Sequence, residues 1–596
     1  MTRRRSRCWL LLACLAGAAA TGCAGGPTVV TKIVDGRVIT TRPVSPQAYE
    51  HVARALLLEQ EGRWEEAARE LQRALPFDDE APELHAHLAE VFLRLARIDD
   101  AADQVARSLA LEPTVAGLIA EGGLREARGD AKGAVDSLRR GVALARGERD
   151  LALLEDAHLG LAEAQIADLD VAGALETAQE LVRLAPATLD GRVHLASYAW
   201  ALGRSEAATA ALQDTVRLEP NHVHALLLLA YLHAALGRTE QAKAAFANAI
   251  DRSEAPFEPA ERYVHWLAER GDLTEARAIA DRLVGSDHDG DDVEARARLA
   301  RAAKRPEQAR AMIEKAIERG DATGRLTLFL GSLAAEVEDD QRALAAFFTI
   351  RKDSPSFLQA RLRASGVLRE AGKWDEAQRL LDEAVAGAAA SVDDAVEIAI
   401  ARSAIDEKRG DGARAARRLD EAAAKVRDGG GEDGSGARVT LALARAAVEE
   451  RRGDWRRAVA IAEAVLAWDP RDARALNFAG FVAADHAADL PRARRRLQAA
   501  AALDPGSGEI LDSVGWAHFR SGDLEEAAAF LEQAARLEPR DPEILGHLGD
   551  LYTRRSERTR AVDTYRRALA EKPDARLRRE LEERVGTLEA KTAAGR

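Results

Sequence analysis

The side chains that could carry thiol chemistry lie at the very start of this chain of 596 residues. Its three cysteines are Cys8, Cys14 and Cys23, so no later residue can form a disulfide, a thiolate metal site or a cysteine nucleophile. The metalloprotease motif H-E-x-x-H and the phosphate loop G-x-x-x-x-G-K-[ST] are both absent. The run Gly429–Gly434 spells G-x-G-x-x-G, but it follows no predicted strand and lies in a low-complexity stretch. We therefore expect no enzymatic activity and no cofactor.

Metal ligation is expected to be absent as well. The run Asp287–Asp292 is acidic, but an EF-hand loop would need glycine at position 292 and glutamate where the chain has Arg298. His85 and His87 are two residues apart, a spacing that places them on different faces of a helix. A solvated acidic loop and ordinary helix positions explain these residues.

The composition indicates a folded and acidic chain. Hydrophobic residues make up 47%, charged residues 31%, and the formal net charge is −14. The apolar fraction is too high for a disordered chain. Nucleic-acid binding is disfavoured, because neutralising phosphates requires a basic surface.

Residues 1–22 have the layout of a secretory signal peptide, with several arginines followed by a short apolar run. The run is shorter than the roughly 20 residues that a membrane-spanning helix needs. The segment from Ala20 to Cys23 resembles a bacterial lipobox, which implies that Cys23 is lipidated and becomes the mature N-terminus. An ordinary signal peptide or a buried apolar segment is the alternative.

The residues after the predicted cleavage site indicate a lipid-anchored protein that faces the periplasm. Ala24 stands where an aspartate would retain a proteobacterial lipoprotein in the inner membrane, so the resemblance implies the outer membrane. Residues 23–47 then form the lipidated cysteine and a flexible tether. A weak strand signal surrounds Asp35-Gly36, a pair typical of hairpin turns.

One alanine recurs through the rest of the chain at a nearly constant interval. Eight of the fourteen steps between successive copies are 34 residues long, and three more differ from 34 by one. Around Ala527, for example, a glycine lies five residues before the alanine, a leucine four residues after it and a proline twelve residues after it. The recurring alanines are Ala67, Ala101, Ala134, Ala174, Ala208, Ala242, Ala276, Ala309, Ala343, Ala377, Ala415, Ala458, Ala493, Ala527 and Ala561.

This pattern resembles the tetratricopeptide repeat, a helix-turn-helix unit of 34 residues. The resemblance covers residues 48–573 and implies an all-α fold, a right-handed superhelical solenoid of about fifteen repeats. The physics agrees, because helices of about a dozen residues are marginal alone and must stack. The alanine permits close approach of the preceding helix, and the glycine suits a left-handed cap at the end of the repeat's first helix.

Breaks in the period predict the domain organisation. Residues 48–427 form an N-terminal array of about eleven repeats, and residues 437–573 form a C-terminal array of about four. The glycine-rich segment 428–436 between them is predicted to be a flexible linker. Residues 574–596 are a capping helix and tail. A longer step also falls near residues 147–156.

The groove of such a solenoid is lined by the first helix of each repeat, here called helix A. Residues three before, one after and four after its small packing residue, such as Gly480 or Gly515, are expected to face this groove. An aromatic there has no core to fill, which favours contact with a protein partner. The alternative is that Trp516 packs against the neighbouring repeat. The predicted groove residues are Asn477, Phe481, Asp512, Trp516, Phe519, Trp200 and Tyr231.

The segment 476–550 carries a sharper likeness. Its run from Leu476 through Gly515-Trp516 to His547-Leu-Gly-Asp550 resembles the C-terminal signature of long repeat lipoproteins of the proteobacterial outer membrane. One member of that group is the adaptor of a periplasmic carboxy-terminal processing protease, to which it presents cell-wall hydrolases. The resemblance implies a membrane-tethered periplasmic scaffold that binds proteins, with a protease and its substrates as partners. The alternatives are an assembly factor for pili, secretins or exopolysaccharide export, and an unrecognised enzyme.

Overall fold

The structure is a computed structural model that describes most of the repeat region. The predicted signal peptide 1–22, Cys23 and the core of the linker 428–436 lie outside the described residues. The chain divides into two compact units, one ending at Ala164 and the other beginning at Gln165. The described residues are 30–34, 37–41, 45–147, 150–284, 293–387, 391–428 and 435–594.

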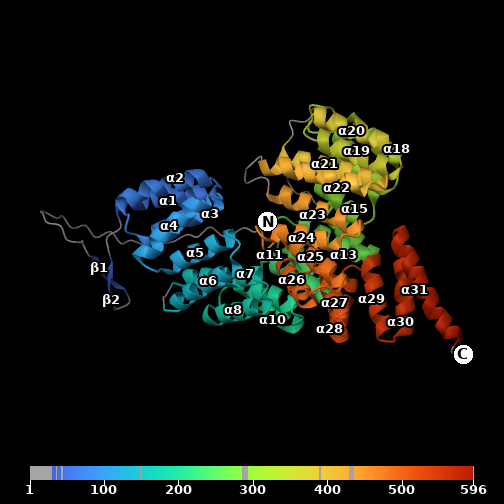
Figure 1. Ribbon diagram of the computed structural model, residues 1–596. Coiled ribbons are helices and arrows are strands. Elements are labelled where there is room, and N and C mark those ends of the chain that lie inside the picture. The colour runs from blue at the N-terminus through green and yellow to red at the C-terminus, as the bar shows by residue number, and fades with distance from the viewer. Residues whose placement is uncertain are drawn as a thin grey trace. The chain divides into compact units, whose positions relative to one another are not determined.

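The first unit contains a two-stranded hairpin and the first helices of the chain (Figure 1). The strands pair antiparallel, with Val30 opposite Thr41 and Val34 opposite Arg37, in the segment where a weak strand signal was predicted. The elements are β1 (Val30–Val34), β2 (Arg37–Thr41), α1 (Pro46–Gln60), α2 (Trp64–Ala74), the 3-10 helix η1 (Leu75–Phe77), α3 (Pro82–Arg94), α4 (Ile98–Leu111), α5 (Val115–Ala127), α6 (Ala131–Ala145) and α7 (Leu151–Ala167), the last of which crosses the boundary.

The second unit is built from helices alone in the residues that the structure describes. These are α8 (Val171–Leu184), α9 (Asp190–Ala201), α10 (Ser205–Leu218), α11 (Val223–Ala235), α12 (Thr239–Asp251), α13 (Phe257–Glu269), α14 (Leu273–Val284), α15 (Val293–Ala302), α16 (Pro306–Arg319), α17 (Arg325–Glu336), α18 (Asp340–Thr349), α19 (Phe357–Glu370), α20 (Trp374–Gly387), α21 (Val392–Lys408), α22 (Gly412–Asp428), α23 (Ser435–Arg451), α24 (Trp455–Leu466), α25 (Ala473–Asp485), α26 (Leu490–Leu503), α27 (Gly508–Ser521), α28 (Leu524–Leu537), α29 (Pro542–Arg554), α30 (Arg558–Ala570) and α31 (Ala575–Ala594).

The helices follow one another in pairs, which confirms the predicted all-α solenoid of tetratricopeptide repeats. Fifteen pairs run from α1 and α2 to α29 and α30 in the described part of the chain, with odd-numbered helices as helix A and even-numbered helices as helix B. All fifteen recurring alanines lie on helix B, and none is more than 1% exposed. A larger side chain at these positions would overpack the contact between the paired helices.

Glycines turn the chain between paired helices where the sequence predicted left-handed caps. Gly522 ends α27 with φ +88°, and Gly203 follows α9 with φ +74°. Residues with a β-carbon rarely adopt this region, whereas glycine enters it without steric cost.

The predicted capping helix is present as α31. It packs against α30 and buries Leu577 and Leu581, which closes the apolar face of the last repeat. Repeat arrays need such an end because each repeat otherwise leaves one face uncovered. None of the described helices combines the length and apolar content required to cross a lipid bilayer.

Two groups of repeats that are distant in sequence contact each other within the second unit. Helices α8 and α9 pack against α26, and α11 packs against α28. Trp200 Nε1 donates a hydrogen bond of 2.9 Å to Gln533 Oε1. Arg536 Nη1 donates to the carbonyl oxygen of Ala235, also at 2.9 Å. The first helices of repeats five and six are therefore covered by the second helices of repeats thirteen and fourteen.

Candidate functional site

Helices α25, α27 and α29 place most of the predicted groove residues side by side. Each of the three helices begins at a capping side chain that accepts hydrogen bonds from the first turn. Asp472 accepts from the amide of Ala475, Ser507 caps α27, and Asp541 caps α29. These caps satisfy amides that a helix leaves unpaired at its start, and so they fix where each helix begins.

Two glycines let helix A approach helix B closely beside the groove. A β-carbon added at Gly480 would lie 2.6 Å from Leu497 Cγ, and one at Gly515 would lie 2.7 Å from Leu531 Cγ. The small packing residues predicted from the sequence are therefore confirmed. Because the glycine side of each helix faces helix B, the residues on its other side are turned toward the neighbouring first helices.

The polar end of the site joins the three helices through side-chain contacts. Asn477 Nδ2 donates to Glu509 Oε1 at 3.3 Å, which links α25 to α27. His547 Nδ1 donates to Asp512 Oδ2 at 2.7 Å, which links α29 to α27. Asn477 and Asp512 are 8% and 5% exposed, and Oδ1 of each has no hydrogen-bond partner among the described residues.

An aromatic cluster, formed by Phe481, Trp516, Phe519 and His547, lies beside the polar end. The Trp516 ring stacks on His547 with centroids 4.2 Å apart and on Phe519 with centroids 4.9 Å apart. Phe481 lies 5.9 Å from the His547 ring. Phe481 and Phe519 are half-buried and keep exposed surface, whereas Trp516 is only 7% exposed.

A charged end lies on the other side of the aromatic cluster. Asp485 Oδ1 accepts hydrogen bonds from Trp516 Nε1 at 3.1 Å and from Arg520 at 3.0 Å. The Arg554 guanidinium lies 5.8 Å from the centre of the Phe519 ring, a favourable cation–π distance. Along the helices, the site therefore passes from carboxylates and an amide, through aromatic rings, to two arginines.

Burial and nearby charges shift the pKa values of three groups at the polar end. Burial favours the neutral ring of His547, but the Asp512 carboxylate together with the charges of Asp550 and Glu543 outweighs burial and raises the pKa of His547. Surrounding protein atoms raise the pKa of the Glu509 carboxyl, and the nearby charges of Asp541 and Asp512 raise it further. The pKa of Glu543 is raised by the same crowding of protein atoms and carboxylates. The polar end thus holds negative charges that repel one another.

Two of the predicted groove residues contact parts of the chain that are distant in sequence. Trp200 is 2% exposed and bonds to Gln533 on α28. Tyr231 is half-buried beside Gly506, and burial raises the pKa of its hydroxyl. The expectation that Trp200 faces an open groove is therefore corrected, whereas Tyr231 keeps part of its surface exposed. Contacts between helices some 300 residues apart in sequence leave no local pattern that could have shown this.

Trp516 also differs from its expected exposure. The ring is held between neighbouring repeats by His547 on one side and by the bond to Asp485 on the other. The packing alternative is therefore correct for Trp516. The exposed aromatic surface of the site comes from Phe481 and Phe519 instead.

Sequence reasoning missed several residues that complete the site, above all His547. The signal was present, since Asn477, Asp512 and His547 are spaced by 35 residues each and so occupy equivalent places in successive repeats. Glu509 and Asp485 were missed because their partners lie one repeat away, where only a three-dimensional alignment of the helices brings them together.

Candidate metal ligands are used in other ways or lie outside the description. Within the described ranges, no group of three or more His, Cys, Asp or Glu side chains is placed to hold a metal ion. His85 contacts Gln104 and the carbonyl oxygen of Asp79, and His87 contacts Glu59. The acidic run Asp287–Asp292 lies outside the described residues.

Comparisons with known proteins agree with the repeat fold. A model of the tetratricopeptide repeat family matches residues 194–259, 482–542 and 514–576, together about a quarter of the chain. The last two segments cover α27 and α29, whereas Asn477 and Phe481 on α25 lie just before them. No curated protein matches the sequence.

Three of the solved structures to which the chain is similar are distant in sequence. The Naa15/Naa10 complex bound to HypK shares 13% identity, covering 92% of this chain and 98% of that chain, with a TM-score of 0.31. A chain of the APC/C hetero-tetramer Cut9-Hcn1 shares 15% identity, covering 91% of this chain and 98% of that chain, with a TM-score of 0.33. PilF of Pseudomonas aeruginosa shares 18% identity over 34% and 89%, with a TM-score of 0.29.

Proposed function

We propose that this protein is a non-enzymatic scaffold that binds an extended segment of a partner protein across α25, α27 and α29. The observation that carries the proposal is the pairing of half-buried aromatic rings with buried acceptor oxygens that have no donor among the described residues. Phe481 and Phe519 offer apolar contact area, and Asn477 and Asp512 offer the unpaired oxygens. A buried acceptor without a donor costs about 1–3 kcal/mol, which a bound peptide amide or cation would recover.

Binding explains the His547–Asp512 pair better than catalysis does. A histidine held by a carboxylate is two thirds of a hydrolytic triad, and the third member is a nucleophile bonded to the other ring nitrogen. Among the described residues, no hydroxyl or thiol is hydrogen-bonded to His547, whose ring instead packs between Phe481 and Trp516. The pair therefore acts as a brace between helices that orients aromatic surface.

The proposed location is the periplasmic side of the bacterial outer membrane, through a lipid on Cys23. The support is the sequence around Cys23, because the structure does not describe it. Changing Cys23→Ala should release the protein from the membrane fraction of a Gram-negative host. Persistence of Cys23→Ala protein in that fraction after a salt wash would contradict the lipid anchor.

The sharpest form of the proposal is an adaptor that presents cell-wall hydrolases to a processing protease. The support is the resemblance of residues 476–550 together with the position of the candidate site in that same stretch. A scaffold with a groove and further repeats can hold two proteins at once, which is what presentation of a substrate requires.

Affinity capture from an envelope extract tests the proposal. Residues 24–596 serve as bait, beside a groove variant with Phe481→Ala and Phe519→Ala. A matched control carries Phe77→Ala and Phe348→Ala, since both of those rings are exposed and lie outside the groove. We expect a protease with cell-wall hydrolases on the wild type and control, and their loss from the groove variant. Capture of pilus, secretin or polysaccharide components instead would replace the adaptor with the assembly factor.

A further inference from the structure

The buried oxygens at the polar end determine which kind of ligand group can bind to them. The amide nitrogen of Asn477 donates to Glu509 at 3.3 Å, and Oδ1 of Asn477 is left without a donor among the described residues. Asp512 uses Oδ2 for His547 and leaves Oδ1 in the same condition. Both of these unpaired oxygens are acceptors, and both belong to residues that are more than nine-tenths buried. A ligand that satisfies them must bring hydrogen-bond donors.

The surroundings of these oxygens are negatively charged. Glu509 lies one helical turn before Asp512 on α27, and Glu543 lies one turn before His547 on α29, so all four share one end of the site. The pKa of Glu509 and that of Glu543 are raised by crowding and by neighbouring carboxylates, Asp541 among them. Carboxylates in the first turn of a helix are ordinary on their own, because the helix dipole favours them. The unpaired buried oxygens beside these carboxylates are not explained by the helix dipole.

Cations near this end are already bound to other carboxylates. Arg584 pairs with Asp550 at 3.3 Å, and Arg576 pairs with Glu580 at 3.1 Å. Arg520 belongs to the charged end, where it holds Asp485. His547 is the titratable donor at the polar end, and Asp512 binds it.

We infer that the partner segment carries a lysine or arginine that binds among Asn477, Glu509 and Asp512, followed by an apolar residue on Phe481 and Phe519. This inference rests on the proposed function, since it names the chemistry of the segment that the groove binds. A cationic side chain supplies several N–H donors and offsets the charge of Glu509 and Glu543. Arg520 and Arg554 at the charged end disfavour a second cation there and set the direction of the segment.

Selection from a random peptide library tests both the groove and the charge. The library is displayed on phage and selected on residues 24–596, and bound peptides are sequenced. We expect enrichment of peptides with lysine or arginine next to an aromatic or aliphatic residue. One enriched peptide is then synthesised with a fluorophore, together with a copy in which each basic residue is replaced by glutamine.

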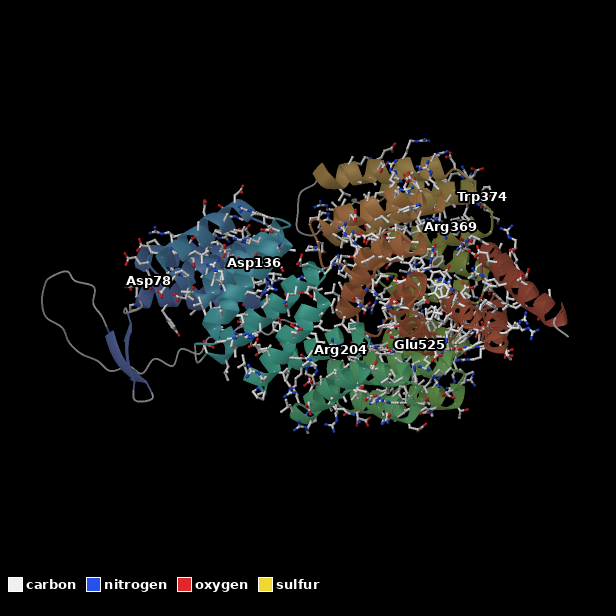
Figure 2. All side chains as sticks on the ribbon, turned by 60° about the horizontal axis from the view of Figure 1, so that its bottom comes forward. Asp78, Asp136, Arg204, Arg369, Trp374 and Glu525 are labelled. Atoms are coloured by element: carbon white, nitrogen blue, oxygen red, sulfur yellow. The ribbon has the colours of Figure 1, made fainter. Side chains whose placement is uncertain are left out.

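Two matched pairs of substitutions assign the charge effect to the polar end. Glu509→Gln with Glu543→Gln removes two first-turn carboxylates from the groove. Glu525→Gln with Glu526→Gln removes two first-turn carboxylates from α28. Figure 2 labels Glu525. The Glu525 side chain is 83% exposed. We expect the groove pair to weaken binding of the basic peptide by about tenfold and to reduce its salt dependence, while the α28 pair leaves binding nearly unchanged.

The outcomes separate the two claims. Peptides that need Phe481 and Phe519 but are neutral or acidic would overturn the inference and leave the groove function standing. An equal loss of affinity for the basic peptide in the groove pair and in the α28 pair would also overturn the inference, because general attraction to an acidic chain would then explain binding. Failure to obtain any peptide whose binding depends on Phe481 and Phe519 would contradict the proposed function itself.

Discussion

Gly515 decides how closely α27 approaches α28, and through that contact it positions the groove residues. A β-carbon there would lie 2.7 Å from Leu531 Cγ, closer than carbon atoms can approach without movement. Its neighbours Asp512, Trp516 and Phe519 are on the same helix, so any shift of α27 moves all three. The glycine therefore has a structural role that its lack of a side chain conceals.

Gly515→Ala should lower the free energy of unfolding by about 1–3 kcal/mol, because the new methyl group overpacks a filled contact. Urea denaturation followed by circular dichroism measures the change. Gly366→Ala is the control, since Gly366 lies in α19 with no atom within 4 Å of the added carbon. There alanine should raise stability by about 0.5–1 kcal/mol through the lower cost of ordering the chain. Equal effects at the two sites would contradict the packing role.

His547 should make stability depend on pH in a definite direction. Its pKa is raised in the folded protein, so the folded state holds the proton more tightly than the unfolded state. The stabilisation is complete below the unfolded pKa of about 6.5 and disappears as the pH rises through the folded pKa. The difference in Tm between wild type and His547→Phe should therefore be largest near pH 6 and shrink toward pH 9, roughly the range of a shifted histidine. A difference that grows with pH would refute the raised pKa.

At the scale of elements, much of the structure follows from patterns within one repeat. The alanines, from Ala67 to Ala561, gave the fifteen helix pairs because burial of a small residue at a fixed offset is a local requirement. The caps at Gly203 and Gly522 followed from backbone geometry. The exposure of Trp200 could not be predicted this way, because its cover comes from α28.

The contact between α9 and α28 can be measured with a double-mutant cycle on Trp200 and Gln533. Trp200→Phe removes the donor, Gln533→Leu removes the acceptor, and the double variant removes both. Either single change leaves a buried polar atom unpaired or an apolar gap, whereas the double change leaves no unpaired partner. We expect the three losses of unfolding free energy to be non-additive, with a coupling of about 0.5–3 kcal/mol.

A cycle between Trp200→Phe and Gly366→Ala provides the control, since no contact joins those positions. That pair should be additive within about 0.5 kcal/mol. Additive losses for Trp200 with Gln533 as well would show that repeats five and six do not contact repeat fourteen in solution.

At the scale of the whole molecule, the division into units does not coincide with the glycine-rich stretch. Helices α22 and α23, on either side of that stretch, pack together like other neighbours in the second unit. The boundary lies instead at Ala164–Gln165, close to the lengthened repeat near residues 147–156. Composition predicts where a chain is free of packing constraints, but only the contacts of the flanking helices decide whether packing continues across it.

The candidate site also shows which features cannot be predicted from the sequence of a single repeat. Five of the groove residues were predicted from the sequence of one helix at a time, and the structure brings them together with His547. They are Asn477, Phe481, Asp512, Trp516 and Phe519. What the sequence could not supply was the exposure of each side chain, because exposure depends on the two neighbouring repeats. That is why Trp516 is packed while Phe481 and Phe519 keep the open surface.

The central claim is that a partner protein lies against the aromatic cluster of α25, α27 and α29. The most direct measurement places a photo-crosslinking amino acid at Phe481 in the full-length protein and irradiates intact bacteria. A second protein carries it at Phe348, a ring that is 47% exposed and lies outside the cluster. We predict a discrete crosslinked partner from position 481, identified by mass spectrometry, and none of it from position 348. The same partner crosslinked from both positions, or from position 348 alone, would contradict the account.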